Sequence, residues 1–401
     1  TLEQYNDATI TGSSTTHNIL VNGVEATITI SDLDIQIPID KNATTASNWI
    51  PAIRLGNGAN LNLILEGKNT LKGGDMCAAI EVPEGCTLTI SGEGSLKATG
   101  GVGAGIGASS MRKGSLGRIE INGGDIEAYG SGMAAGIGGS VEGSIGTIVI
   151  NGGTVYAKGG HGSYPKDIKN VYGGAGIGGG AYGCVDRIEI NGGNVTACGG
   201  YATNAGRHPG AAIGTGGGGA KPVEDGYKYG EIVIKGGTVS AIAYNNEVYA
   251  IGIGVKPGQA LQEGTLVGSI SISDKAVVNL NGGDYFPKSE NPGLKNYTIQ
   301  GTIADVRFIE SAYPVTISVG EITWNAGTMK VSDYQVTLKA SNYLKPLTPG
   351  TPVTVTVTVG DYVYQMEADV ADVDDKNATI TLKAATPLYE TRLKFVSTAT
   401  R

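Results

Sequence analysis

The feature that most constrains this chain is an internal repeat. A short motif, Gly or Ala followed by Ile and Gly, recurs at intervals of 31 to 40 residues. Repeats of this length are typical of solenoids, in which one unit cannot bury its apolar side chains alone and must stack on its neighbours. We therefore predict that the central isoleucines form one inward-facing row. They are Ile106, Ile137, Ile177, Ile213 and Ile251.

A second motif follows these isoleucines. It reads Ile-x-Ile, then Asn-Gly-Gly or Lys-Gly-Gly, then a short stretch that ends in Ala. Alternation places both isoleucines on one face of a strand, and the glycine pair allows a turn with positive φ. Each unit is then one rung of three short strands, from which loops of different length leave at fixed corners. The motif begins at Ile119, Ile148, Ile188 and Ile232, and more loosely at Ser269.

Composition excludes several classes of protein. Gly provides 66 of 401 residues, roughly twice the usual share, and inside a helix each Gly costs about 1 kcal/mol relative to Ala. The net charge is −8 and Lys and Arg form no long run, which argues against nucleic acid or an anionic membrane as the partner. No apolar stretch approaches the roughly 18 residues of a membrane span. We expect that any signal peptide or lipid anchor has been removed from this chain.

The composition changes after about residue 281, and residues 288–297 are typical of a linker. Beyond the linker, valines and threonines alternate over residues 353–359, a pattern that predicts strands with one buried and one solvated face. Several such segments in about 100 residues favour an immunoglobulin-like β-sandwich. The predicted domains are a solenoid of about seven to eight rungs at residues 1–287, the linker, and the β-sandwich at residues 298–401.

The repeats also resemble a known family. The runs at residues 78–101, 146–160 and 174–179, the last reading GAGIGG, are similar to the β-helical carbohydrate-binding domains of bacterial cell-surface proteins. The resemblance covers roughly residues 19–283. It implies a right-handed parallel β-helix, export, and attachment to the bacterial cell surface. One class in that family binds acidic plant polysaccharide such as polygalacturonate, with calcium present, without cleaving it. The family has no universal catalytic motif, so no site residue follows from the resemblance.

Parallel β-helices also support polysaccharide lyases and hydrolases, which need clustered carboxylates or a carboxylate with a basic residue. The outward rows of the predicted strands show no such cluster. One row alternates acidic and apolar residues: Glu120, Val149, Glu189 and Val233. Another contains a single acid: Glu127, Tyr156, Thr196 and Ser240. A third separates two arginines by a threonine: Arg118, Thr147 and Arg187. We predict binding without turnover, with a lyase or hydrolase as the alternative.

Tyrosines in the long loops are the strongest sign of a binding surface. Tyrosine combines a flat apolar ring with a hydroxyl group, which suits contact with sugar rings. The alternative is that these rings only cover the glycine-rich core. Two further loop tyrosines, Tyr244 and Tyr249, are not included in the predicted face. That face comprises His161, Tyr164, Tyr172, Tyr182, Tyr201, His208, Tyr227 and Tyr229.

Cysteines and acidic residues give weaker indications. In an exported protein, disulfides Cys77–Cys86 and Cys184–Cys198 would be allowed, and the alternative is free thiols packed as small apolar groups. No cofactor is predicted, and calcium is the alternative. Two acidic groups could be considered for calcium, although the second is more typical of a hairpin turn. They are Asp32, Asp34 and Asp40, and Asp372, Asp374 and Asp375.

These observations predict a monomeric, non-catalytic protein of the bacterial cell surface that binds an extended polysaccharide through the solenoid loops. Two alternatives remain open. One is a surface adhesin that binds a host or partner protein, and the other is a polysaccharide lyase or hydrolase built on the β-helix.

Overall fold

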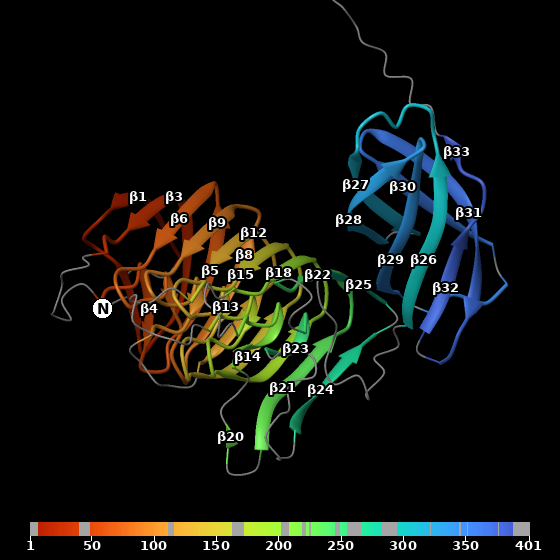
Figure 1. Ribbon diagram of the computed structural model, residues 1–401. Coiled ribbons are helices and arrows are strands. Elements are labelled where there is room, and N and C mark those ends of the chain that lie inside the picture. The colour runs from red at the N-terminus through yellow and green to blue at the C-terminus, as the bar shows by residue number, and fades with distance from the viewer. Residues whose placement is uncertain are drawn as a thin grey trace, which may run out of the picture. The chain divides into compact units, whose positions relative to one another are not determined.

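The computed structural model describes residues 7–39, 49–110, 116–162, 172–201, 208–218, 222–223, 226–244, 249–254, 266–273, 275–281, 295–320, 322–344, 346–350, 352–375 and 377–387. These residues form β-strands joined by turns and loops (Figure 1). The chain divides into two compact units, Thr1–Gly293 and Leu294–Arg401. The first is a parallel β-helix, as predicted, and the second is a separate β-structure.

Each rung of the β-helix contributes one strand to each of three faces. On the first face, the Ile-x-Ile motifs pair in parallel with their counterparts one rung away, as at Ile119, Ile148 and Ile188. The strands of this face are β5 (Asn60–Glu66), β8 (Thr87–Gly92), β11 (Arg118–Ile121), β14 (Ser144–Ile150), β17 (Cys184–Ile190), β21 (Gly226–Ile234) and β24 (Leu266–Ile272).

The second face follows the Gly-Gly turn. Its strands also pair in parallel, and their alanines form a fully buried row that includes Ala128, Ala157 and Ala197. The strands are β6 (Lys68–Lys72), β9 (Ser95–Thr99), β12 (Asp125–Tyr129), β15 (Thr154–Lys158), β18 (Asn194–Cys198), β22 (Gly237–Ile242) and β25 (Ala276–Asn281).

Longer strands begin the solenoid. The strand β3 (Glu25–Gln36) runs through both of these faces, since it pairs with β5 and then with β6. The strand β1 (Ala8–Ser14) pairs with β3 on its other side. Near the other end, β20 (Pro222–Val223) pairs antiparallel with β21.

The third face contains the Gly/Ala-Ile-Gly motifs. The predicted isoleucine row is confirmed, because all five isoleucines pair in register from rung to rung and are fully buried. The strands are β2 (Ile19–Asn22), β4 (Ile53–Gly56), β7 (Ile80–Glu81), β10 (Ile106–Gly107), β13 (Ile137–Gly138), β16 (Ile177–Gly178), β19 (Ile213–Gly217) and β23 (Ile251–Gly254).

Glycine is required on this face by close stacking. Gly178 has φ of 136°, and a Cβ there would collide with the backbone carbonyl of Gly214 on the next rung. The same arrangement recurs at Gly107 and Gly214. The glycine after each central isoleucine therefore lets successive rungs approach to backbone contact.

The second unit differs in detail from the predicted sandwich. Its strands form one sheet that closes on itself through the pairing of β30 with β31, so the two expected layers are sides of one barrel-like sheet. The strands are β26 (Lys295–Ala304), β27 (Ala312–Val319), β28 (Ile322–Ser332), β29 (Gln335–Leu344), β30 (Val353–Val359), β31 (Tyr362–Asp372), β32 (Asn377–Leu382) and β33 (Thr386–Pro387). The first of these begins inside the predicted linker, because Tyr297 is fully buried in the core of this unit.

Neither suggested disulfide is formed, since Cys86 and Cys198 are free cysteines. Cys77 follows β6 and Cys86 precedes β8, so the third-face side of the rung separates them. Cys184 begins β17 and Cys198 ends β18, which places them at opposite ends of two consecutive strands. The buried Cys86 instead packs as a small apolar residue.

Candidate functional site

Three aromatic side chains stack at one corner of the β-helix. His161, Tyr201 and Tyr244 follow the second-face strands β15, β18 and β22, so they lie on three consecutive rungs. The ring centroids of His161 and Tyr201 are 3.9 Å apart, and those of Tyr201 and Tyr244 are 4.8 Å apart with their planes 18° from parallel. We call these three residues the corner stack.

A second group of rings lies in the loops before and after the third-face strands. The rings of Tyr172 and His208 stack at 4.8 Å with an interplanar angle of 13°, because their backbones form a parallel bridge between consecutive rungs. The ring of Tyr182 lies 4.4 Å from that of Tyr172. We call these three residues the loop stack.

Glycine backbone connects the two stacks. Gly173 follows Tyr172, and Gly200 precedes Tyr201. A Cβ at Gly173 would collide with the carbonyl of Gly200, so the backbone segments that carry the two stacks are in contact here. Gly218 leaves room for the rings of the loop stack, because a Cβ there would come within 2.8 Å of the Tyr182 ring.

Tyr182 itself has an uncommon backbone. Its φ is 56°, a left-handed conformation that costs a bulky residue free energy. Glu142 has the same conformation one rung earlier, with φ of 57°. The turn on the following rung uses Gly218, with φ of 84°. An aromatic residue is therefore present at a position where glycine would be less strained.

Two of the stacked rings have a shifted pKa. Burial, and then the positive charge of Lys158, lowers the pKa of His161 below its usual value. Burial, and then the hydrogen bond with Tyr172, raises the pKa of Tyr182. All six rings are partly exposed rather than buried in the core. The arrangement therefore offers apolar ring surface together with hydroxyl and imidazole groups.

The structure thus brings together five of the eight residues predicted from the sequence. These are His161, Tyr172, Tyr182, Tyr201 and His208. Tyr164 lies outside the described residues. Tyr227 and Tyr229 lie on β21, but their side chains are not among those that the structure describes.

Sequence reasoning left Tyr244 out of the predicted face. Its place directly after a second-face strand, which it shares with Tyr201, could have identified it.

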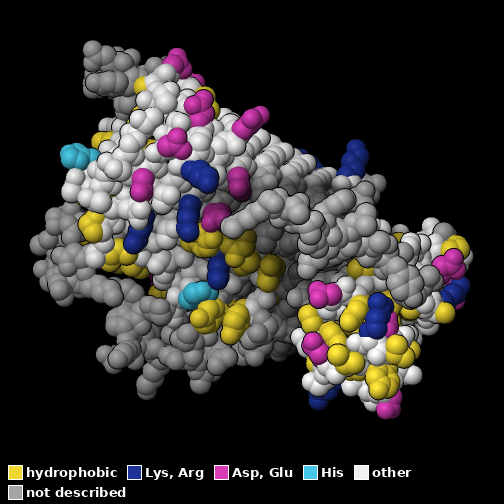
Figure 2. Space-filling model, turned by 90° about the horizontal axis from the view of Figure 1, so that it is seen from above, with side chains coloured by type: hydrophobic (Ala, Val, Ile, Leu, Met, Phe, Trp, Pro, Cys, Tyr) yellow, Lys and Arg dark blue, Asp and Glu magenta, His cyan; other side chains and the backbone are white. Residues whose placement is uncertain are grey.

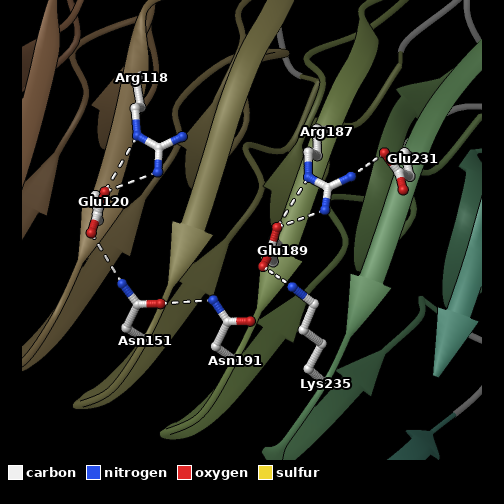
Figure 3. A network of polar contacts seen from close by, with 8 residues as sticks. All are labelled: Arg118, Glu120, Asn151, Arg187, Glu189, Asn191, Glu231 and Lys235. Carbon is white, nitrogen blue, oxygen red and sulfur yellow. Dashed lines mark hydrogen bonds and ion pairs between the residues drawn. The ribbon is translucent and has the colours of Figure 1, made fainter. Parts of the chain in front are cut away.

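A charged network covers part of the first face (Figure 3). Arg187 donates to Glu189 at 2.7 Å and also contacts Glu231, while Lys235 contacts the other oxygen of Glu189. These contacts, with Lys235 first and Arg187 second, lower the pKa of Glu189 to about 2. The carboxylate of Glu189 is therefore held ionised.

The neighbouring rungs carry a ladder of asparagines. Asn191 donates to Asn151, and Asn151 donates to Asn122, each at 2.7 Å. Asn151 also donates to Glu120 at 3.1 Å, and Arg118 donates to Glu120 at 3.0 Å. The predicted order Glu120, Val149, Glu189 and Val233 along this face is confirmed by the strand register.

Most of the acidic residues considered for calcium have other roles in the described part of the chain. Asp32 accepts the backbone N–H of Lys68 at 2.9 Å, and Asp34 accepts the side chain of Gln36. Asp374 accepts the backbone N–H of Asn377 at 2.7 Å in a turn, and Asp372 pairs with Lys295. Within the described residues, no three His, Cys, Asp or Glu side chains are placed to share a metal ion. Asp40 lies outside the described residues.

Comparison with known proteins agrees with the fold. A family model described as a beta helix repeat matches residues 88–110, 119–141 and 188–217. The first unit carries beta helix repeats. Searches of curated proteins and of solved structures gave no significant match. Among the residues that the structure describes, no helix is long and apolar enough to cross a membrane.

Proposed function

We propose that the β-helix binds an extended glycan chain without cleaving it, through the corner stack and the loop stack. The observation that carries this proposal is the convergence of six partly exposed aromatic rings on consecutive rungs, all outside the buried isoleucine and alanine rows. Proteins place aromatic residues with a polar tip where one side of a ligand is apolar and the other is hydrated.

The stacking of the rings on one another determines which parts of each ring a sugar could contact. Within each stack the middle ring contacts a neighbour on both sides, as Tyr201 and Tyr172 do. A sugar then contacts ring edges and hydroxyl groups rather than two free faces. Polar recognition by neutral hydroxyls suits a ligand that is itself rich in hydroxyl groups.

The charged network supports binding rather than hydrolysis. A general acid must carry a proton near the working pH, whereas Glu189 has a pKa of about 2 and is paired with two basic side chains. Glu120 is engaged by Arg118 and Asn151. The proposal includes action at a bacterial cell surface, because the repeats resemble those of surface carbohydrate-binding domains.

Affinity electrophoresis in gels that contain pectin, xyloglucan, arabinoxylan or galactomannan tests the proposal. We expect retardation of the wild-type protein by at least one polysaccharide, and loss of retardation in the variant with Tyr172→Ala and Tyr201→Ala. Its melting temperature should change little, since neither side chain belongs to the core. The matched control is Tyr334→Ala, which removes a 56% exposed tyrosine from the second unit.

Two results would contradict the proposal. Retardation by none of the polysaccharides would favour a protein partner instead. Release of reducing sugar or of an unsaturated product over time, abolished by one Asp, Glu or His substitution, would identify an enzyme.

A further inference from the structure

A third aromatic group lies on the outer surface of the second face. Lys97 on β9, Glu127 on β12 and Tyr156 on β15 occupy one outward row, in register on consecutive rungs. Tyr129, two residues after Glu127, points outward from the same strand in the neighbouring row. We call Lys97, Glu127, Tyr129 and Tyr156 the tyrosine strip.

The members of the strip contact one another across three rungs. The rings of Tyr129 and Tyr156 are 5.8 Å apart with their planes inclined by 50°. The ammonium group of Lys97 lies 5.5 Å from the centre of the Tyr129 ring, within the range of a cation–π contact. The hydroxyl of Tyr129 donates to Glu127 at 3.0 Å. The strip thus joins two rings, one ammonium group and one carboxylate.

The fold does not require tyrosine at these positions. Along the row of Tyr156, the next two rungs carry Thr196 and Ser240. Along the row of Tyr129, the neighbouring rungs carry Thr99 and Lys158. Both tyrosines are partly exposed, so their rings lie on the surface rather than in the core.

The strip leads into the corner stack. Lys158 pairs in register with Tyr129 and lies near enough to His161 to lower the pKa of that imidazole. Figure 2 views the side of the β-helix that lies at the top of Figure 1, where charged and hydrophobic side chains are exposed. Ring surface and polar groups therefore continue from β9 towards the loops after β15, β18 and β22.

We propose that the tyrosine strip forms additional subsites for the same glycan, which runs along the solenoid axis from β9 to the corner stack. This inference rests on the proposed function and adds the direction and length of the bound chain. Neighbouring strands lie about 4.8 Å apart, so the track from β9 to β22 spans roughly 20 Å. That length accommodates several sugar units, and affinity should rise with chain length until the track is filled.

The test measures affinity against chain length. Oligosaccharides of increasing length, prepared from the polysaccharide that retards the wild type most, are titrated by calorimetry against the wild type and against Tyr129→Ala with Tyr156→Ala. For the longest chains, we expect the double variant to lose about tenfold in affinity. For disaccharides, which bind at the stacks alone, the loss should stay below about twofold.

Matched variants separate contact from folding. Thr70 lies in the same outward row, one rung before Lys97. The Thr70→Ala variant should leave the dependence of affinity on chain length unchanged. If the double alanine variant does not fold, Lys97→Ala takes its place, because an exposed lysine is not needed for packing. It should also weaken only the long chains.

The outcomes distinguish this inference from the proposed function. Equal binding of every chain length by the wild type and the strip variants, with loss of binding in Tyr172→Ala with Tyr201→Ala, would overturn the strip and leave the proposed function intact. A loss that is the same for short and long chains would also overturn it. Absence of glycan binding by the wild type would overturn both.

Discussion

The two units differ in where their aromatic residues lie: inside the core in the second unit, and outside the core in the β-helix. In the second unit, Tyr297, Phe308, Tyr313 and Tyr364 lie inside the core. In the described part of the β-helix, the buried side chains are mostly Ile, Val, Leu and Ala, and the stacked tyrosines lie outside. Among the described residues, both units consist of strands joined by turns and loops, so strand content does not explain this difference.

The repetition of the β-helix explains this difference in the placement of aromatic residues. An inward position of the β-helix recurs about 4.8 Å away on the next rung, so a large ring there would meet another inward side chain above and below. In the closed sheet each inward position is unique, and rings of different orientation fit together, as Phe308 does with Tyr313 at 5.6 Å and with Tyr364 at 5.9 Å. Aromatic residues therefore stabilise the second unit from within, whereas the stacked rings of the β-helix are partly exposed.

The largest effect on stability is expected from a substitution in one inward row of the β-helix. Ile177→Asp places a carboxylate at a fully buried position between Ile137 and Ile213. Burial of an unpaired charge costs several kcal/mol, so we expect the β-helix not to fold. Circular dichroism and a thermal melt check this, with Thr196→Asp on the outer face as the control. A soluble Ile177→Asp protein of unchanged stability would contradict the register.

A smaller effect separates two kinds of glycine. Gly178→Ala adds a Cβ that collides with the backbone of the next rung, and we expect a loss of more than ~3 kcal/mol. Gly320→Ala in the second unit has φ of 59° but meets no atom within 4 Å, so only the backbone penalty of about 1 kcal/mol remains. Denaturant unfolding of both variants measures the contrast. Equal losses would show that stacking adds nothing.

Acid should weaken each unit through one paired carboxylate. The folded pKa of Glu189 is about 2, below the unfolded value of about 4.3. Its contribution is therefore present above pH 4.3 and lost as the pH falls towards 2. Arg307, and then the hydroxyl of Tyr364, lower the pKa of Asp305 in the second unit with the same sign.

We expect Glu189→Gln to remove on the order of 1–2 kcal/mol of this acid dependence from the β-helix transition only. Asp305→Asn should act on the second unit only. Thermal melts between pH 5 and pH 2 give the answer. If either variant altered both transitions equally, the units would not unfold separately.

The smallest effect is expected when the β-helix is deleted. The second unit has its own buried cluster and a sheet that closes within residues 295–387, so residues 294–401 should fold alone. Their melting temperature should differ little from that of the second transition in the full chain. Amide spectra of the isolated unit provide the check, and undispersed resonances would refute independent folding.

The repeat of the first unit could be recognised in the sequence because it is a local pattern. Ile177 and Ile137 each lie between glycines, and Ile213 lies between Ala212 and Gly214, so similar surroundings predict equivalent places in successive rungs. The row from Glu120 to Val233 followed from the same counting. The second unit offered no repeat. The parallel pair β26 and β32, whose strands lie far apart in the sequence, came only from the structure.

The sequence by itself determined the solenoid and the presence of tyrosines outside its core. Tertiary structure alone decided which rings meet. Tyr172 contacts Tyr182 on its own rung and His208 on the next, and Tyr201 joins Tyr244 across a rung. The contacts of the loop stack depend on the path of loops whose lengths vary between rungs, and no periodicity describes them. Strand residues repeat because backbone pairing sets their spacing, whereas loop residues come together only through the packing of the whole rung.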